Sequence, residues 1–133
     1  MNYELHDYEI DSVEFEDNKI IFSFPNGFYV EDDQGCEVKP SRRKLVFTIN
    51  KGCCSDSPSE SFISIRRITR RGKKWKEISF QQFKSLFKKG NMFIYDEYDS
   101  KSDDCKMLQI NTNTKWNVIE FFITDIENVE CPE

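Results

Sequence analysis

The sequence contains no alanine and only four leucines among its 133 residues. Both residue types are strong helix formers, so a mainly helical fold is disfavoured. In their place stand 13 isoleucines, 6 valines, 12 phenylalanines, 5 tyrosines and 2 tryptophans. Because β-branched and aromatic side chains pack well on a pleated surface, this composition predicts a mainly β protein.

Long apolar stretches are also missing from the sequence. The apolar runs are short, as in Ile20, Ile21 and Phe22, whereas a membrane-spanning helix needs roughly 20 consecutive apolar residues. The N-terminal segment has neither the basic start nor the apolar stretch of a secretory signal. We therefore expect a cytoplasmic protein without a membrane partner.

The length suits one domain, so residues 1–133 are expected to form a single globular unit. Strand candidates bounded by turn residues recur along the chain, as in antiparallel sheet proteins. The alternation of apolar and acidic residues over 8–16 slips near Ser12, which predicts a bulge. The run 25–27 (Pro-Asn-Gly) predicts a turn. The last candidate, over 116–124, is apolar on both faces, as in a central strand that is covered on both sides.

One helix is predicted within this series of strands, near 79–89. Ser79 and Gln82 have the spacing of a capping box. Four apolar side chains follow at helical spacing: Phe80, Phe83, Leu86 and Phe87. Gly90 is suited to end the helix. Since the apolar stripe must lie on a sheet, the predicted fold is mainly β (α+β), an antiparallel β-sandwich or sheet of seven to eight strands with one packed helix.

Charge is strongly segregated along this acidic chain. Residues 1–37 carry a net charge of −10, residues 38–89 carry +12 and residues 90–133 carry −7, although the whole chain carries only −5. Two interpretations are open. Acidic and basic strands are neighbours in the sheet and pair with each other, or the basic segment stands apart and creates a surface field of one sign.

The second interpretation centres on a predicted basic hairpin over 66–76. Its candidate binding residues are Arg66, Arg67, Arg70, Arg71, Lys73, Lys74, Trp75 and Lys76. The cations could bind phosphates while Trp75 stacks on a base, and they could equally bind an acidic protein. The acidic remainder of the chain would repel a polyanion, so nucleic acid is the less favoured partner. The acidic segments could in turn receive a basic protein.

Catalysis and metal binding have little support in the sequence. There are five cysteines, an odd number, and none forms a C-x-x-C pair, so neither a disulfide framework nor a structural zinc site is expected. His6 is the single histidine, and there is no glycine-rich phosphate loop and no G-x-S-x-G elbow. We therefore predict that the protein is no enzyme, with no catalytic residue, no metal site and no cofactor.

The N-terminal part carries a resemblance to known proteins. Leu5, His6 and Asp7 precede an alternating strand, a short turn and a second strand over 20–24, which Gly27 follows. This outline, with the helix start near 78–79 and the closing strands, resembles small uncharacterised β-rich bacterial proteins. Some of those are similar to immunity proteins of polymorphic toxin systems. The resemblance implies a cytoplasmic bacterial protein that binds another protein without catalysis.

The sequence thus predicts a non-catalytic protein-binding domain, and more specifically an immunity-type protein that neutralises a toxin through charged surfaces. The alternative is an anion- or nucleic-acid-binding module that uses the basic hairpin 66–76. A third hypothesis, an apolar ligand held among the many aromatic rings, competes with the simpler expectation that these rings fill the core.

Overall fold

Alternating apolar residues and short polar turns produce a series of strands interrupted by one helix. The computed structural model describes residues 2–3, 5–31, 42–50, 62–69, 74–102, 104–112 and 117–132. The strands are β1 (Asn2–Tyr3), β2 (Glu9–Ile10), β3 (Ser12–Glu16), β4 (Lys19–Phe28), β5 (Val30–Glu31), β6 (Arg42–Ile49), β7 (Ile63–Thr69), β8 (Lys74–Ile78), β9 (Met92–Asp99), β10 (Lys106–Asn111), β11 (Asn117–Ile123) and β12 (Ile126–Glu130). The helix α1 (Phe80–Ser85) continues into a 3₁₀-helix over Leu86–Lys89.

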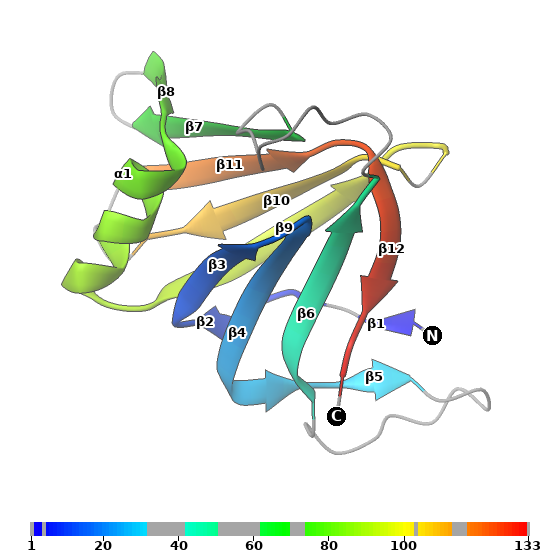
Figure 1. Cartoon of the computed structure of the whole chain (residues 1–133). Coiled ribbons are helices and arrows are strands. Elements are labelled where there is room, and N and C mark those ends of the chain that lie inside the picture. Colours follow the sequence, from blue (N-terminus) through cyan, green and yellow to red (C-terminus); the bar gives the residue numbers. More distant parts are fainter. Residues whose placement is uncertain are drawn as a thin grey trace.

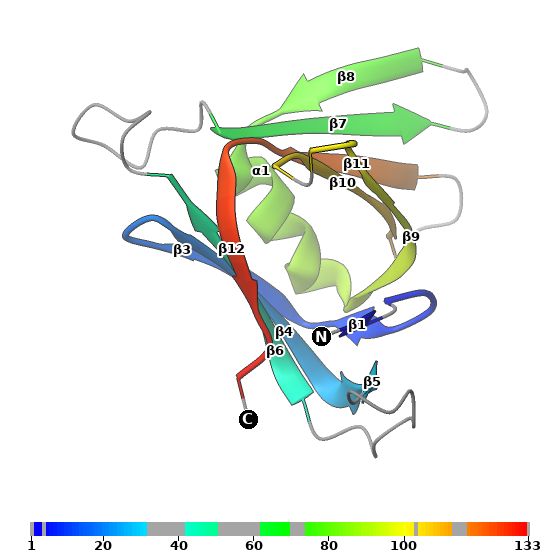
Figure 2. The same ribbon diagram turned by 90° about the vertical axis from the view of Figure 1, so that its right-hand side faces the viewer.

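The strands form two large antiparallel sheets that face each other, with α1 between them (Figures 1 and 2). One sheet has six strands in the order β2-β9-β10-β11-β7-β8, and the other has four in the order β12-β6-β4-β3. β1 and β5 make a separate pair. The predicted fold class, a mainly β sandwich with one packed helix, is confirmed.

The described residues contain twelve strands rather than seven or eight. Three of the twelve, β1, β2 and β5, have only two residues each. β12 escaped prediction because its apolar residues, Ile126 and Val129, are three positions apart and break the period of two. A register shift between Ile126 and Asn128 in its pairing with β6 explains that spacing.

The chain passes from the six-stranded sheet to the four-stranded sheet at two corners. Asp11 lies between β2 and β3, and Asp125, with a φ of 56°, lies close before β12. Corners of this kind join sheets whose strands cross at a steep angle, as Figure 1 shows for these two. The slip in alternation near Ser12 is therefore a change of sheet and not a bulge, because a different sheet defines the inward face on each side of Asp11.

The run 25–27 does not separate two strands as predicted, because it lies inside β4, whose last part bends in Figure 1. β4 continues through Pro25 to Phe28, with a shift in its register against β6 between Ser23 and Phe28. Gly27 adopts a φ of 74°, a value that costs glycine little. The proline and glycine therefore produce an irregularity inside a long strand.

The helix forms as its sequence predicts, with a shorter α-helical part. The Ser79 hydroxyl accepts a hydrogen bond from the backbone N–H of Gln82 at 3.1 Å, and the Ser79 backbone N–H donates to the Gln82 side chain at 2.8 Å. Phe83 is fully buried, and its ring lies 5.1 Å from that of Phe121 in β11. Phe80, on the same face, contacts Phe15 of β3. The helix thus packs against both sheets.

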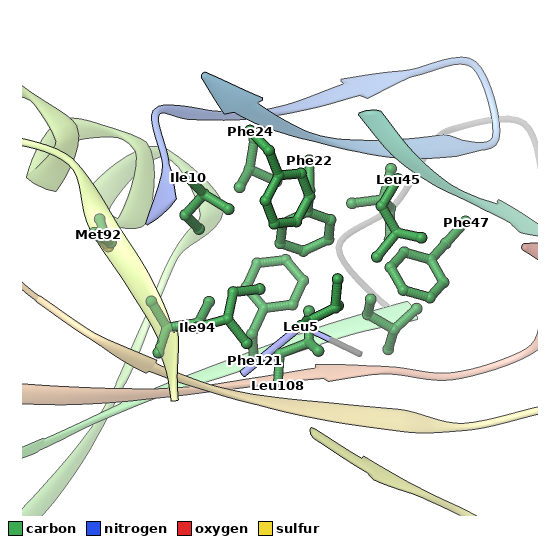
Figure 3. Close-up of a cluster of buried hydrophobic side chains, with 14 of the residues drawn as sticks. Leu5, Ile10, Phe22, Phe24, Leu45, Phe47, Met92, Ile94, Leu108 and Phe121 are labelled. Atoms are coloured by element: carbon green, nitrogen blue, oxygen red, sulfur yellow. The ribbon is translucent and has the colours of Figure 1, made fainter. Parts of the chain in front are cut away.

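The core lies between the two sheets and consists mainly of branched and aromatic side chains, which point toward one another in Figure 3. Phe22 of β4 makes edge-to-face contacts with Phe47 of β6 at 5.8 Å and with Phe121 at 5.5 Å between ring centroids. The aromatic rings of these strands therefore fill the core, as the simpler sequence expectation held.

The expectation of a last strand covered on both faces needs correction. Ile119, Phe121 and Ile123 of β11 are buried in the core. On the opposite face Phe122 is only half-buried, and no described helix or strand lies over it. The apolar residues on that face are shielded by side chains of neighbouring strands instead of by a second layer.

Replacing Phe121 with alanine tests the central place of this ring. We expect Phe121→Ala to lower the free energy of unfolding by about 3–5 kcal/mol, because it removes contacts to both β4 and α1 and leaves a cavity. Phe93→Ala, at an exposed position of the same sheet, should cost about 1 kcal/mol or less. Denaturant titration measures both values, and similar losses for the two variants would contradict this account of the core.

Candidate functional site

The predicted basic hairpin exists as the pair β7 and β8. It lies at one end of the six-stranded sheet, where β7 pairs with β11 and β8 is the last strand (Figure 1). Of the candidate binding residues, Arg66 and Arg67 lie in β7, while Lys74, Trp75 and Lys76 lie in β8. Arg70, Arg71 and Lys73 lie outside the described residues.

The register divides the hairpin side chains between the two faces of the sheet. Arg67 is opposite Lys76, whereas Ile68 is opposite Trp75. Because successive residues of a strand point to opposite faces, Trp75 shares a face with Arg66, and Lys74 and Lys76 share the other with Arg67. The candidate residues therefore do not form one continuous basic surface.

Arg66 is held in place by three neighbours. Its Nη2 lies 3.1 Å from Oε1 of Glu120 in β11. Its guanidinium carbon lies 5.5 Å from the ring centroid of Trp75 and 4.8 Å from that of Phe122. A cation between two aromatic faces is attracted to both, and the planar guanidinium suits this stacking. Arg66 thus links β8, β7 and β11 on one face of the sheet.

This ion pair also bears on the charge segregation. Arg66 belongs to the basic segment and Glu120 to the acidic C-terminal segment. Lys84 of α1 likewise pairs with Glu14 of the acidic N-terminal segment at 2.8 Å. Segments of opposite sign are therefore neighbours at these two places, as the first interpretation of the charge pattern expected. No ion pair to Lys74 or Lys76 occurs among the described residues.

The face that carries Arg66 is the outer face of the six-stranded sheet, turned away from the four-stranded sheet. Strand register arranges its side chains in three rows. The first row contains Trp75, Ile68, Val118, Asn111, Phe93 and Glu9. The second contains Glu77, Arg66, Glu120, Gln109 and Asp96. The third contains Ser64, Phe122, Met107 and Tyr98. A polar row thus runs between two rows rich in apolar side chains.

Large aromatic side chains are exposed on this outer face. Trp75 is 63% exposed, Phe93 is 41% exposed and Tyr98 is 51% exposed. Tyr95, also in β9, is exposed as well. Exposed large apolar groups that gather on one surface mark interaction sites more often than scattered ones do. The sequence predicted Trp75 as a binding residue but not Phe93 or Tyr98. For Phe93 a signal was present, because it lies between the apolar residues Met92 and Ile94, which are buried.

Asp96 and Glu9 carry the negative charge at the β9 end of the outer face, and Asp96 contacts Tyr98. The Tyr98 hydroxyl donates a hydrogen bond to Oδ2 of Asp96 at 3.1 Å, and the backbone N–H of Glu97 donates to Oδ1 at 2.8 Å. The hydrogen bond to Asp96, together with its negative charge, raises the pKa of Tyr98 above its usual value. Asp96 therefore orients the half-exposed Tyr98 ring.

Two other acidic residues of β9 point inward and are neutralised there. Lys106 of β10 is only 8% exposed, and its Nζ lies 2.9 Å from Glu97 and 3.2 Å from Asp99. A buried lysine needs such partners because desolvation penalises an isolated charge. These groups form a structural ion-pair cluster in which Lys106 is buried, Glu97 is partly buried and Asp99 reaches the surface.

The remaining candidate chemistry falls at separate places. His6 contacts the Tyr95 carbonyl through Nδ1, and its Nε2 lies 3.2 Å from Asp7. Cys105 is half-buried and Cys131 is buried, and the other three cysteines lie outside the described residues. Among the described residues, no group of three His, Cys, Asp or Glu side chains could hold a metal ion. In the same part of the chain, no helix is long and apolar enough to cross a membrane.

Comparisons of the chain with protein-family models, with curated proteins and with solved structures found no match.

Replacing Asp96 with asparagine tests the contact that positions Tyr98. We expect Asp96→Asn to lower the pKa of Tyr98 toward its ordinary value, because the variant removes the negative charge that opposes ionisation of the phenol. Asp99→Asn is the matched control, since Asp99 pairs with Lys106 and should leave Tyr98 unaffected. Titration of the Tyr98 ring signals by NMR measures the pKa, and an unchanged value in Asp96→Asn would refute the contact.

Proposed function

We propose that this chain is a non-catalytic protein-binding domain whose partner binds the outer face of the six-stranded sheet. The observation that carries the proposal is the exposure of Trp75, Phe93 and Tyr98 on a single sheet face that no described element covers. Tryptophan, tyrosine and arginine contribute most often to the energetic centres of protein interfaces.

The rigidity of the outer face supports the same proposal. Arg66 packs between Trp75 and Phe122 and is anchored by Glu120, while Asp96 anchors Tyr98. Side chains that are already ordered lose less conformational entropy when a partner binds, so more of the contact energy appears as affinity. The central polar row offers hydrogen-bonding groups between the two apolar rows, which would favour a partner of matching pattern.

The narrower form of the proposal is an immunity-type protein of the bacterial cytoplasm that neutralises a toxin. It draws support from the resemblance of the N-terminal outline and from charge of opposite sign at the two ends of the sheet. Lys74 and Lys76 lie at the β8 end on the face opposite to the outer face, whereas Asp96 and Glu9 lie at the β9 end on the outer face itself. Such charge patterns accelerate association and fix the orientation of the partner.

The alternative function, binding of nucleic acid, would use the β8 end alone. Arg67, Lys74 and Lys76 lie on one face and could bind phosphates, while the exposed ring of Trp75, on the other face, could stack on a base. Arg66 is already engaged by Glu120, and Asp96 and Glu9 lie at the far end of the same sheet. Nuclease treatment separates this alternative from protein binding.

Affinity capture from nuclease-treated source cells tests the proposed function. The tagged protein should retain a partner in stoichiometric amount, and Trp75→Ala combined with Phe93→Ala and Tyr98→Ala should weaken its binding by about tenfold or more, since truncating one central aromatic residue costs roughly 2 kcal/mol. Tyr29→Ala is the matched control, because Tyr29 is also exposed but lies outside the outer face.

Equal retention by the triple variant and the control would contradict binding through the outer face. Retained material that disappears after nuclease treatment would favour the nucleic-acid alternative. For the narrower form, the captured protein should be toxic when it is expressed alone and harmless when it is expressed with this chain.

A further inference from the structure

The six-stranded sheet ends in a strand with one unpaired side. β8 is hydrogen-bonded to β7 alone, and its residues Lys74, Trp75, Lys76 and Glu77 are all exposed. No described residue hydrogen-bonds the free side of this strand. An edge of this kind presents N–H and C=O groups that can pair with another extended chain.

The other edge strands of the two large sheets carry contacts within the described residues. At the β9 end, the N–H of Ile94 donates to the Tyr8 carbonyl at 2.9 Å, and Asp96 accepts from the Glu97 N–H at 2.8 Å. The Tyr95 carbonyl of this edge is bonded to His6. β8 has no comparable cover.

The two edge strands of the four-stranded sheet each carry at least one contact on their outer side. β3 is flanked by α1, through the Glu14–Lys84 ion pair and the contact of Phe15 with Phe80. At β12, the N–H of Ile126 donates to the carbonyl of Asp104 at 2.9 Å. Among the described residues, β8 differs from these edge strands because no such contact lies on its free side.

The side chains of β8 define the strand that would fit beside it. Lys74 and Lys76 lie on one face, and Trp75 lies on the other. Directly opposite residues of neighbouring strands point to the same face and interact, and opposite charges or aromatic–apolar pairs stabilise the contact. A complementary strand carries acidic residues opposite the two lysines and an apolar residue opposite Trp75.

A second copy of this chain does not meet that requirement. If two β8 strands pair in antiparallel with Trp75 opposite Trp75, Lys74 lies opposite Lys76. If they pair with Lys76 opposite Lys76, two lysines again lie opposite each other. Like charges directly opposite each other are destabilising. Lysines at an edge thus deter pairing with the same edge, and they favour an acidic strand.

We propose that β8 accepts an extended acidic segment of a partner protein, with alternating acidic and apolar residues, as an additional strand of the six-stranded sheet. This inference rests on the proposed protein-binding function and names the form of the partner. Main-chain hydrogen bonds supply affinity in strand addition, and alternate side chains supply specificity. The apolar residue opposite Trp75 would extend the first row of the outer face, next to the ring that Arg66 supports.

A synthetic peptide tests this inference on the full chain. The probe is a nine-residue peptide in which glutamate alternates with valine and tyrosine, and its controls have the same composition in a non-alternating order or lysine in place of glutamate. We expect saturable binding of the alternating acidic peptide alone, with NMR shifts and slowed hydrogen exchange concentrated in the amides of β8. Equal binding of all three peptides, or shifts outside β8, would overturn the inference.

Charge-reversal variants test the role of the two lysines. Lys74→Glu combined with Lys76→Glu should weaken peptide binding by about tenfold or more, because two attractive cross-strand pairs become repulsive. Lys88→Glu combined with Lys101→Glu makes the same change in net charge at exposed positions elsewhere and should leave binding nearly unchanged. Equal losses in both variants would indicate unspecific charge attraction and would refute the inference.

Two further measurements separate strand addition from other forms of binding. A peptide N-methylated at its three central residues cannot donate main-chain hydrogen bonds from those residues and should bind much more weakly, so unchanged affinity would overturn the inference. Sedimentation without peptide tests the other occupant, since a dimer with protected β8 amides would show that a second copy fills the edge.

Phe93→Ala combined with Tyr98→Ala should leave the affinity for the peptide unchanged. If the peptide fails while these substitutions still weaken capture of the protein partner, the strand-addition proposal falls and the proposed function remains.

Discussion

The packing of Phe121 is the constraint on which the rest of the structure depends. Its ring contacts Phe22 of the four-stranded sheet at 5.5 Å and Phe83 of the helix at 5.1 Å, while its backbone belongs to the six-stranded sheet. Because residues of a strand alternate between faces, burying Phe121 directs Glu120 and Phe122 outward. These two residues hold Arg66, and Arg66 supports Trp75. The arrangement of the outer face thus follows from a contact in the core.

Local signals predicted the parts of the fold that depend on near neighbours in the sequence. The capping box at Ser79 and Gln82 formed as expected. So did the short turn before the strand over 20–24, where Asp17 has a φ of 55° that an aspartate tolerates in tight turns. The slip near Ser12 and the run 25–27 were misinterpreted, because their meaning depends on which sheet each strand joins. That information comes from contacts with β9 and β6, which are far away in the sequence.

The candidate site shows the same division between local and long-range information. The hairpin of β7 and β8 could be predicted from its own sequence, and so could the exposure of its charged residues. The separation of Arg66 from Lys74 and Lys76 follows from strand register, and the support of Arg66 by Glu120 requires β7 to lie beside β11. Tyr98 is positioned by its hydrogen bond to Asp96. Both residues lie in β9, where a bulge changes which residues point to the outer face. No pattern in the sequence predicts that bulge.

The segregation of charge along the sequence therefore has two consequences in space. Where basic and acidic strands are neighbours, as at Arg66 and Glu120, their charges neutralise each other and contribute to the fold. Where the basic segment reaches the end of the sheet, Lys74 and Lys76 have no such neighbour among the described residues. Specificity is a difference between affinities, so a feature that weakens unwanted pairing is as useful as one that strengthens the correct pairing. The lysines of β8 do both, since the charge that repels a like edge is the one that attracts an acidic strand.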